Sequence, residues 1–320
     1  MLLNLGIFSL LAFFIFKQGF ATDQQSRQWN ALLSKLSDPY NGLFFLLALL
    51  LVPVNWGIES LKWQILLKPL ARVNFKNSLF QVLTGVTAGF ISPNRIGEHF
   101  GRIWPLRADL RLAAFSNNVR GSFAQVIVTM LFGLIGLFFL LDQNQLILPD
   151  WIVPPSLILG SFGLLGFLSL FLFWQRLIEK LPKRLLKTKW GELTSTSGGE
   201  LRFSDQINLI GLSMIRYLVY CTQYLLICKG MGMDFQSAIY CSIPMIFFFQ
   251  TLSPGLALVD LGIRGNLAVW FLSPFCSEPI LALAAALTIW LINLVLPAIA
   301  GSFLMLSARS KSADQYQTSG

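Results

Sequence analysis

The sequence has few charged residues. Only 12% of its 320 residues are Asp, Glu, Lys or Arg, whereas 55% are hydrophobic and the mean hydropathy is +0.65. About a quarter of the residues in soluble domains are charged, so this composition excludes an ordinary soluble globular protein. Long apolar runs separated by short polar segments instead predict an all-α integral membrane protein, with one transmembrane domain over residues 1–320.

The signatures of common catalytic and metal sites are missing too. The one histidine, His99, cannot form a His-based metal site alone, and the sequence contains no P-loop, nucleophile elbow or HExxH motif. The four cysteines form no CxxC pair and lie in or beside apolar segments, as small core residues do: Cys221, Cys228, Cys241 and Cys276. We therefore expect no cofactor, no metal and no enzymatic activity.

Acidic residues are outnumbered, with 15 Asp and Glu against 24 Lys and Arg, which gives a formal net charge of +9. No nucleic-acid-binding motif accompanies this charge, so we expect no nucleic-acid partner. Sixteen of the 24 bases fall in four segments that we assign to the cytoplasm: 68–77, 95–111, 175–206 and the tail after residue 307. This positive-inside bias predicts a multi-pass protein of the cell membrane with both termini cytoplasmic.

Six apolar segments are expected to span the membrane as helices, since a crossing needs about 20 residues. They cover residues 2–16 (extending towards 20), 42–67, 112–141, 156–174, 207–228 and 280–307. The polar segment 18–41 is expected to be a loop, and 175–206 a basic cytoplasmic loop. Pro53 is expected to break the second span. In that span Glu59 and Lys62 can pair at a separation of three residues or, alternatively, snorkel at the helix end.

Two further apolar segments do not fit a single crossing. Residues 78–91 are only about 14 long, which favours a re-entrant hairpin that breaks near Pro93 and returns through a charged helix. Residues 235–274 contain two apolar pieces divided at 251–255. We expect a second re-entrant hairpin there, with two short spans as the alternative.

The first of these hairpins contains the most unusual stretch of the chain, TAGFISPNRIGEHFGRIWPLR at 87–107. Ser92 is expected to cap a helix that begins at Pro93 and Asn94, because serine and proline favour these positions. One helix would then carry five charged or titratable side chains: Arg95, Glu98, His99, Arg102 and Arg107. A helix start beside surplus arginines attracts anions such as phosphate. The alternative is a basic juxtamembrane face that only sets topology.

The second hairpin repeats this pattern. Its break reads QTLSPGLALVDLGIRGN, so that Ser253, Pro254, Asp260 and Arg264 follow in the order Ser-Pro, acid, Arg. The Ser-Pro pairs are about half a chain apart, and each half runs span, span, hairpin, span. We therefore predict an inverted-topology repeat with halves 1–141 and 156–307 and a substrate site between the two breaks.

These two stretches carry a family resemblance. Pro93, Gly97, Glu98 and Arg102 resemble one motif, and Ser253, Pro254, Gly255, Gly262 and Arg264 a second motif, of the lysylphosphatidylglycerol synthase transmembrane region family, also called the flippase-like domain or UPF0104 family. The family's second motif continues with Glu, where this chain has Gly265. The resemblance implies a lipid-translocating protein that handles anionic or isoprenoid-phosphate lipids.

The expected function is therefore to bind and translocate such a lipid, with membrane lipids as partners. The phosphate would meet Arg95, Arg102 and the helix start at Ser92 from one side and Arg264 and the start at Ser253 from the other. Arg120 and Arg216 would be interior bases, or alternatively members of structural salt bridges. Two other functions remain open: a membrane-embedded transferase acting on a lipid phosphate, and a non-transporting scaffold.

Overall fold

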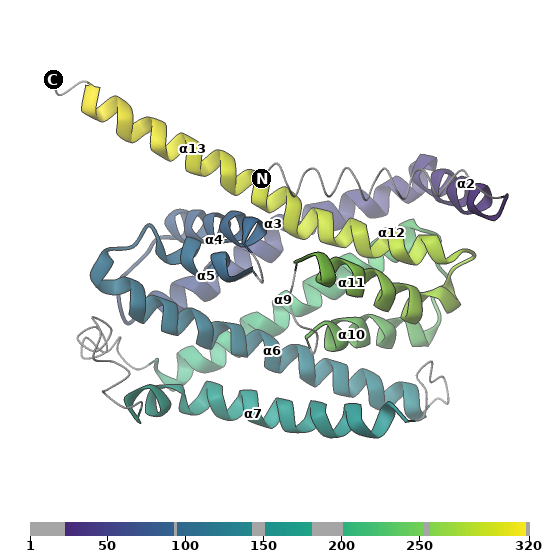
Figure 1. The fold of residues 1–320 in the computed structure, drawn as a ribbon, viewed down its shortest axis with the longest axis horizontal. Helices are drawn as coiled ribbons and strands as arrows, with labels where there is room; N and C mark the ends of the chain where they lie inside the picture. The colour runs from purple at the N-terminus through teal and green to yellow at the C-terminus, as the bar shows by residue number, and fades with distance from the viewer. Residues whose placement is uncertain (1–22, 93–94, 143–150, 181–200, 252–256, 318–320) are drawn as a thin grey trace.

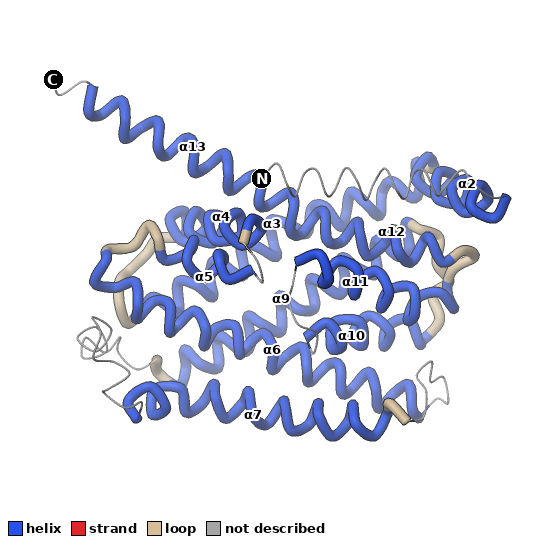
Figure 2. The backbone as a smooth tube through the Cα atoms, viewed as in Figure 1, coloured by secondary structure: helices blue, strands red, loops and turns tan. Residues whose placement is uncertain are grey.

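The computed structural model describes residues 23–92, 95–142, 151–180, 201–251 and 257–317 (Figure 1). Within these ranges the chain is helical and contains no strand (Figure 2). Five helical segments are long and apolar enough to cross a membrane: Pro39–Leu67, Ala108–Leu141, Leu157–Leu177, Phe203–Gly230 and Pro279–Ser307. They correspond to five of the six predicted spans, and the first predicted span lies outside the described residues. The chain therefore has the architecture of an all-α, multi-pass membrane protein.

The segment before the first of these five helices was predicted to be a loop, and this prediction is wrong. Residues Asp23–Ser37 form helix α2, which buries Leu32. Helix α3 (Pro39–Leu67) follows at once, because the Asp38 carboxylate accepts a hydrogen bond from Tyr40 N at 2.9 Å and proline is favoured in the first turn. Pro53 does not break α3, which is continuous through it.

Each of the two segments predicted as a hairpin contains a pair of helices that pack on each other. Helix α4 (Phe75–Ile91) packs on α5 (Ile96–Ile103), and α10 (Ser237–Thr251) packs on α11 (Ala257–Leu272). In the first hairpin glycines allow the two helices to touch: a Cβ on Gly85 would lie 2.5 Å from Arg102 Cγ, and one on Gly101 would lie 2.8 Å from Gly85 Cα. Close packing of α4 on α5 therefore depends on residues without side chains.

The start and end of the charged helix differ from the prediction. Ser92 ends α4 and does not cap α5; the N-cap of α5 is Arg95, in a left-handed conformation with φ 54°. The Ser92 hydroxyl still serves the helix start, since it accepts a hydrogen bond from Gly97 N at 2.7 Å. Helix α5 ends at Ile103, so Arg107 lies beyond it, in an exposed ion pair with Asp109.

At each of the four remaining predicted spans, the helical segment extends beyond the predicted bounds. The elements in this part of the chain are η2 (Ala108–Leu110), α6 (Arg111–Asp142), α7 (Val153–Lys180), α9 (Phe203–Gly230), η3 (Ser273–Phe275), α12 (Pro279–Trp290), the π-helical η4 (Leu291–Val295) and α13 (Leu296–Gln317). The basic loop predicted at 175–206 is helical at both ends, and its residues 181–200 lie outside the described part. The last predicted span continues as helix through its polar tail, and α13 projects past the rest of the molecule (Figure 1).

Contacts between distant helices organise the fold. Helix α3 packs along α9, α4 packs on α13, and α10 packs on α6, which α7 covers on the outside (Figure 1). Polar side chains join some of these helices: Thr87 Oγ1 donates to Ala298 O at 2.8 Å between α4 and α13, and Lys68 Nζ pairs with the buried Asp205 at 2.8 Å. The first turns of α5 and α11 both lie near the middle of the molecule (Figure 1).

Candidate anion-binding site

A network of charged side chains lies inside the protein and is centred on Glu59 of α3. Arg102 Nη1 of α5 lies 2.6 Å from Glu59 Oε1, and both side chains are at most 9% exposed. Lys62 Nζ, one turn along α3, lies 3.2 Å from Glu59 Oε2. The pairing of Glu59 with Lys62 predicted from their spacing is thus confirmed, and the alternative of a snorkelling helix end is wrong, since both side chains are buried.

Helix α5 extends this network from Arg102 back to its own first turn. Arg102 Nη2 lies 2.6 Å from Glu98 Oε1, and Arg95 Nη2 lies 2.7 Å from Glu98 Oε2. These are the helical separations of four and three residues that place the side chains on one face. Asn118 of α6 joins the network as well, because its Oδ1 lies 3.4 Å from Arg102 Nη1 and its Nδ2 lies 2.8 Å from His99 Nδ1.

Helix α9 closes the network from the other half of the chain. Arg216 Nη1 lies 3.4 Å from Glu59 Oε2 and 3.4 Å from Gln125 Oε1. The Arg216 guanidinium lies over the Trp56 ring, with its Cζ 5.4 Å from the ring centre. Gln125 also accepts a hydrogen bond from Lys62 at 3.3 Å. Arg216 thus makes one of the structural salt bridges that the sequence left open.

A small polar cavity of about 40 Å³ lies beside this network. Arg95 and Arg216 line it together with Arg264 of α11, so the two hairpins and α9 each bring an arginine to the same cavity. The other lining residues are Trp56, Tyr220, Trp290, Asn293 and Leu294. Asn293 belongs to the π-helical η4, and its Oδ1 accepts a hydrogen bond from Asn55 Nδ2 at 2.8 Å.

Three of the residues that line the cavity have a buried nitrogen donor without a hydrogen-bond partner among the described residues. The donors are Arg95 Nε, Arg216 Nε and Trp56 Nε1. A buried donor without an acceptor costs about 1 to 3 kcal/mol, so such groups mark a place where a ligand or water is expected. Because two of the three belong to guanidinium groups, the ligand they favour is an anion.

The charges of the network support the same conclusion. Glu59 and Glu98 supply two carboxylates, whereas Lys62, Arg95, Arg102 and Arg216 supply four cations, which leaves an excess of two positive charges. Uncompensated charge is costly in an apolar interior. An anion in the cavity would neutralise it.

The structure separates the residues predicted from sequence into three groups. Arg95, Arg216 and Arg264 line the cavity, whereas Glu98 and Arg102 lie behind it and hold Arg95 and the hairpin in position. Arg120 was predicted as an interior base of the site, but its Nε donates to Phe171 O at 3.1 Å and its guanidinium stacks on the Phe171 ring, so this buried side chain points to α7. Pro93, Asn94, Ser253, Pro254 and the side chain of Asp260 lie outside the described part of the chain.

Sequence reasoning named Glu59 only as a possible salt-bridge partner of Lys62, Arg120 or Arg216, and it did not assign Trp56 or Asn293 to the site. Glu59 had a detectable signal, since an acid in an apolar span needs a cation, but Lys62 nearby offered a sufficient local partner. Nothing in the local sequence distinguishes Trp56 and Asn293 from other membrane-helix residues. No three His, Cys, Asp or Glu side chains come together as a metal site in the part of the chain that is described.

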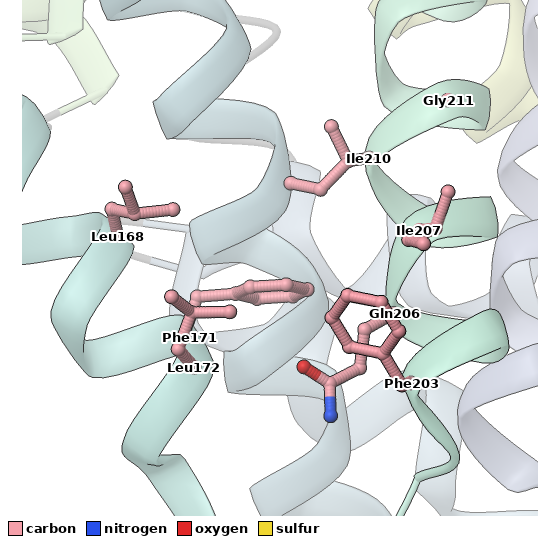
Figure 3. Close-up of a pocket in the computed structure, with 8 residues that line it drawn as sticks. All are labelled: Leu168, Phe171, Leu172, Phe203, Gln206, Ile207, Ile210 and Gly211. Atoms are coloured by element: carbon pink, nitrogen blue, oxygen red, sulfur yellow. The ribbon is translucent and has the colours of Figure 1, made fainter.

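A second, larger cavity of about 320 Å³ lies between α7 and α9 and is lined almost entirely by apolar side chains (Figure 3). Leu168 and Phe171 face Phe203, Ile207 and Ile210 across it, and Gln206 is the one residue with a polar side chain in its lining. It therefore suits hydrocarbon and offers no charge to hold an anion.

Comparison of the chain with protein-family models, with curated proteins and with solved structures finds no match. The resemblance to the flippase-like family therefore stays a prediction that depends on the two motifs alone.

Proposed function

We propose that the protein binds an anionic or isoprenoid-phosphate lipid by its head group and translocates it across the membrane, as a member of the flippase-like family would. The observation that carries the proposal is that Trp56, Arg95 and Arg216 line one cavity inside an apolar protein, and that each has a buried nitrogen without a hydrogen-bond partner among the described residues. Phosphate head groups are the anions that a membrane presents to such a cavity. Binding one would satisfy the donors and neutralise the surplus positive charge.

The two hairpins suit this function. With 15 to 17 residues, α4, α10 and α11 are shorter than a typical crossing, and α5 has only 8. We propose that each hairpin enters the membrane and returns on the same side. Non-helical backbone is tolerated at membrane depth where it lines a polar cavity, and α11 and the N-cap of α5 each bring an arginine to such a cavity.

The packing supports an inverted repeat. The first hairpin packs through α4 on α13 of the second half, while the second hairpin packs through α10 on α6 of the first half. Helices α3 and α9, which occupy the same place in their halves, pack on each other. This reciprocal exchange is what a pseudo-twofold axis between residues 1–141 and 156–307 would produce, and transporters built in this way bind substrate at the interface of the halves.

The positive-inside bias supports a location in the cell membrane with both termini and the basic segment 175–206 in the cytoplasm. Lipid translocation needs no catalytic group, and we propose that the protein is not an enzyme.

The proposal is tested by transport of a fluorescent anionic lipid in proteoliposomes. We expect Arg216→Gln and Arg264→Gln to abolish transport, because each removes an arginine that lines the cavity. Arg107→Gln is the matched control, since it removes an arginine that is 81% exposed and remote from the network, and transport should be unchanged.

Two outcomes would contradict the proposal. Unaltered transport in both cavity variants would exclude the cavity as the head-group site and favour a scaffold. Chemical turnover of a lipid phosphate by the purified protein would favour the transferase instead.

A further inference from the structure

The charge of the site exceeds what a phosphodiester can neutralise. Four cations and two carboxylates give the network an excess of two positive charges. The phosphodiester of a common phospholipid carries one negative charge, whereas a phosphate monoester carries about 1.5 to 2 at pH 7. The monoester is the closer match.

The arrangement of donors points the same way. Trp56 of α3, Arg95 at the start of α5 and Arg216 of α9 line the cavity from three different elements, and each has a buried nitrogen donor without a partner among the described residues. A phosphate monoester offers three terminal oxygens as acceptors, while a phosphodiester offers only two that are not bridging. Three donors from three directions are thus satisfied together by the terminal phosphate.

The size of the cavity adds a third argument. A water molecule needs roughly 10 to 15 Å³ of such space, so about 40 Å³ accommodates a group of only a few heavy atoms. A bare phosphate is a group of this kind. A phosphodiester, whose phosphate carries a second group such as glycerol, serine or ethanolamine, would have to place that second group among Trp56, Trp290 and Leu294.

We infer that the ligand of this cavity is a lipid that ends in a phosphate monoester, with the phosphate held by Arg95, Arg216 and Trp56 and the chain directed into the membrane. This inference depends on the proposed function and specifies the substrate class of the same site. Glu59 is a positioning residue in it, because its carboxylate contacts both Arg102 and Arg216.

The test compares two lipids with identical acyl chains on the unaltered full-length protein in detergent micelles. Phosphatidic acid supplies a monoester, phosphatidylglycerol supplies a diester, and inorganic phosphate shows whether the lipid part is needed. We expect phosphatidic acid to bind at least about tenfold more tightly than phosphatidylglycerol at pH 7.5, and inorganic phosphate to bind more weakly than either lipid.

The pH dependence gives a second readout. Between pH 7.5 and 5.5 a monoester loses its second charge, so the preference for phosphatidic acid should shrink. Titration of the protein groups in the network, namely Glu59, Lys62, Glu98 and His99, would affect both lipids, and phosphatidylglycerol therefore controls for it. The arginines Arg95, Arg102, Arg216 and Arg264 stay charged over this range.

Equal affinity for the two lipids, or tighter binding of phosphatidylglycerol, overturns the inference while leaving the proposed lipid-binding function intact. Tighter binding of inorganic phosphate than of phosphatidic acid overturns the lipid part of the inference. Binding of none of the three overturns both the inference and the proposed function.

Discussion

Arg102 on α5 and Glu59 on α3, 43 residues apart in the chain, are joined by an ion pair of 2.6 Å in which both side chains are buried. The pair fixes the first hairpin to the helix that also carries Trp56 and Lys62. Since Glu59 contacts Arg216 of α9 as well, one carboxylate connects both halves of the protein at the cavity.

Glu59→Gln should destabilise the protein strongly. It leaves Lys62 and Arg216 without their carboxylate partner and Arg102 with Glu98 alone, in the protein interior. Breaking a buried ion pair from one side lowers the free energy of unfolding by about 3 to 5 kcal/mol. The midpoint of thermal unfolding of the purified protein measures this. The control is Asp109→Asn in an exposed ion pair, which should change stability by less than about 1 kcal/mol. A similar midpoint for both variants would contradict the central role of Glu59.

Gly101→Ala should weaken the hairpin. The added methyl group would lie 2.8 Å from Gly85 Cα and Thr84 O, and backbone atoms cannot move aside without separating α4 from α5. Overpacking of this kind costs about 1 to 3 kcal/mol. Gly166→Ala on α7 is the matched control, because its methyl group would meet nothing within 4 Å and alanine favours helix. Thermal midpoints should fall for the first variant and hold or rise for the second; the reverse order would refute the close contact.

Arg95→Asn should weaken lipid binding without unfolding the protein. Arg95 occupies a left-handed backbone conformation, which asparagine tolerates better than most residues, so the turn is preserved while the guanidinium is lost. A hydrogen bond to a charged group contributes about 1.5 to 3 kcal/mol, which predicts a loss of affinity of at least about tenfold. Titration with phosphatidic acid measures the affinity. Unchanged binding at an unchanged thermal midpoint would show that Arg95 does not bind the lipid.

Asn55 and Asn293 should be coupled energetically. Their amides form a buried hydrogen bond of 2.8 Å between α3 and the π-helical η4. Asn293→Leu alone leaves the Asn55 amide unsatisfied, at a cost of about 1 to 3 kcal/mol, whereas changing both to Leu removes the unpaired groups together. In a double-mutant cycle of unfolding free energies we expect the double variant to lose less than the sum of the single variants. Additive losses would show that the two amides act independently.

Gly211→Leu should leave lipid translocation unchanged. Gly211 lines the large apolar cavity between α7 and α9, and a Cβ there meets nothing within 4 Å, so a leucine side chain can enter the cavity (Figure 3). Transport in proteoliposomes measures the effect. If this variant lost transport while Arg216→Gln stayed active, the substrate would bind in the apolar cavity and not in the polar one.

Much of the fold followed from local patterns. Hydropathy located the five helices that can cross a membrane, and the interrupted apolar segments located the helix pairs α4–α5 and α10–α11, because these features depend only on neighbouring residues. The loop predicted before α3 failed for the opposite reason: α2 is polar on average and is stabilised by packing on α3 and α12, which no local pattern reports.

Composition and hydropathy were enough to predict a helical membrane protein. Helical spacing was enough to place Arg95, Glu98 and Arg102 on one face of a helix. The tertiary structure was needed to show that Glu59 pairs with Arg102, that Arg120 contacts α7, and that a single cavity is lined by Arg95, Arg216 and Arg264. Contacts of this kind depend on how whole helices cross, which is set by the packing of many side chains together and by no single stretch of sequence.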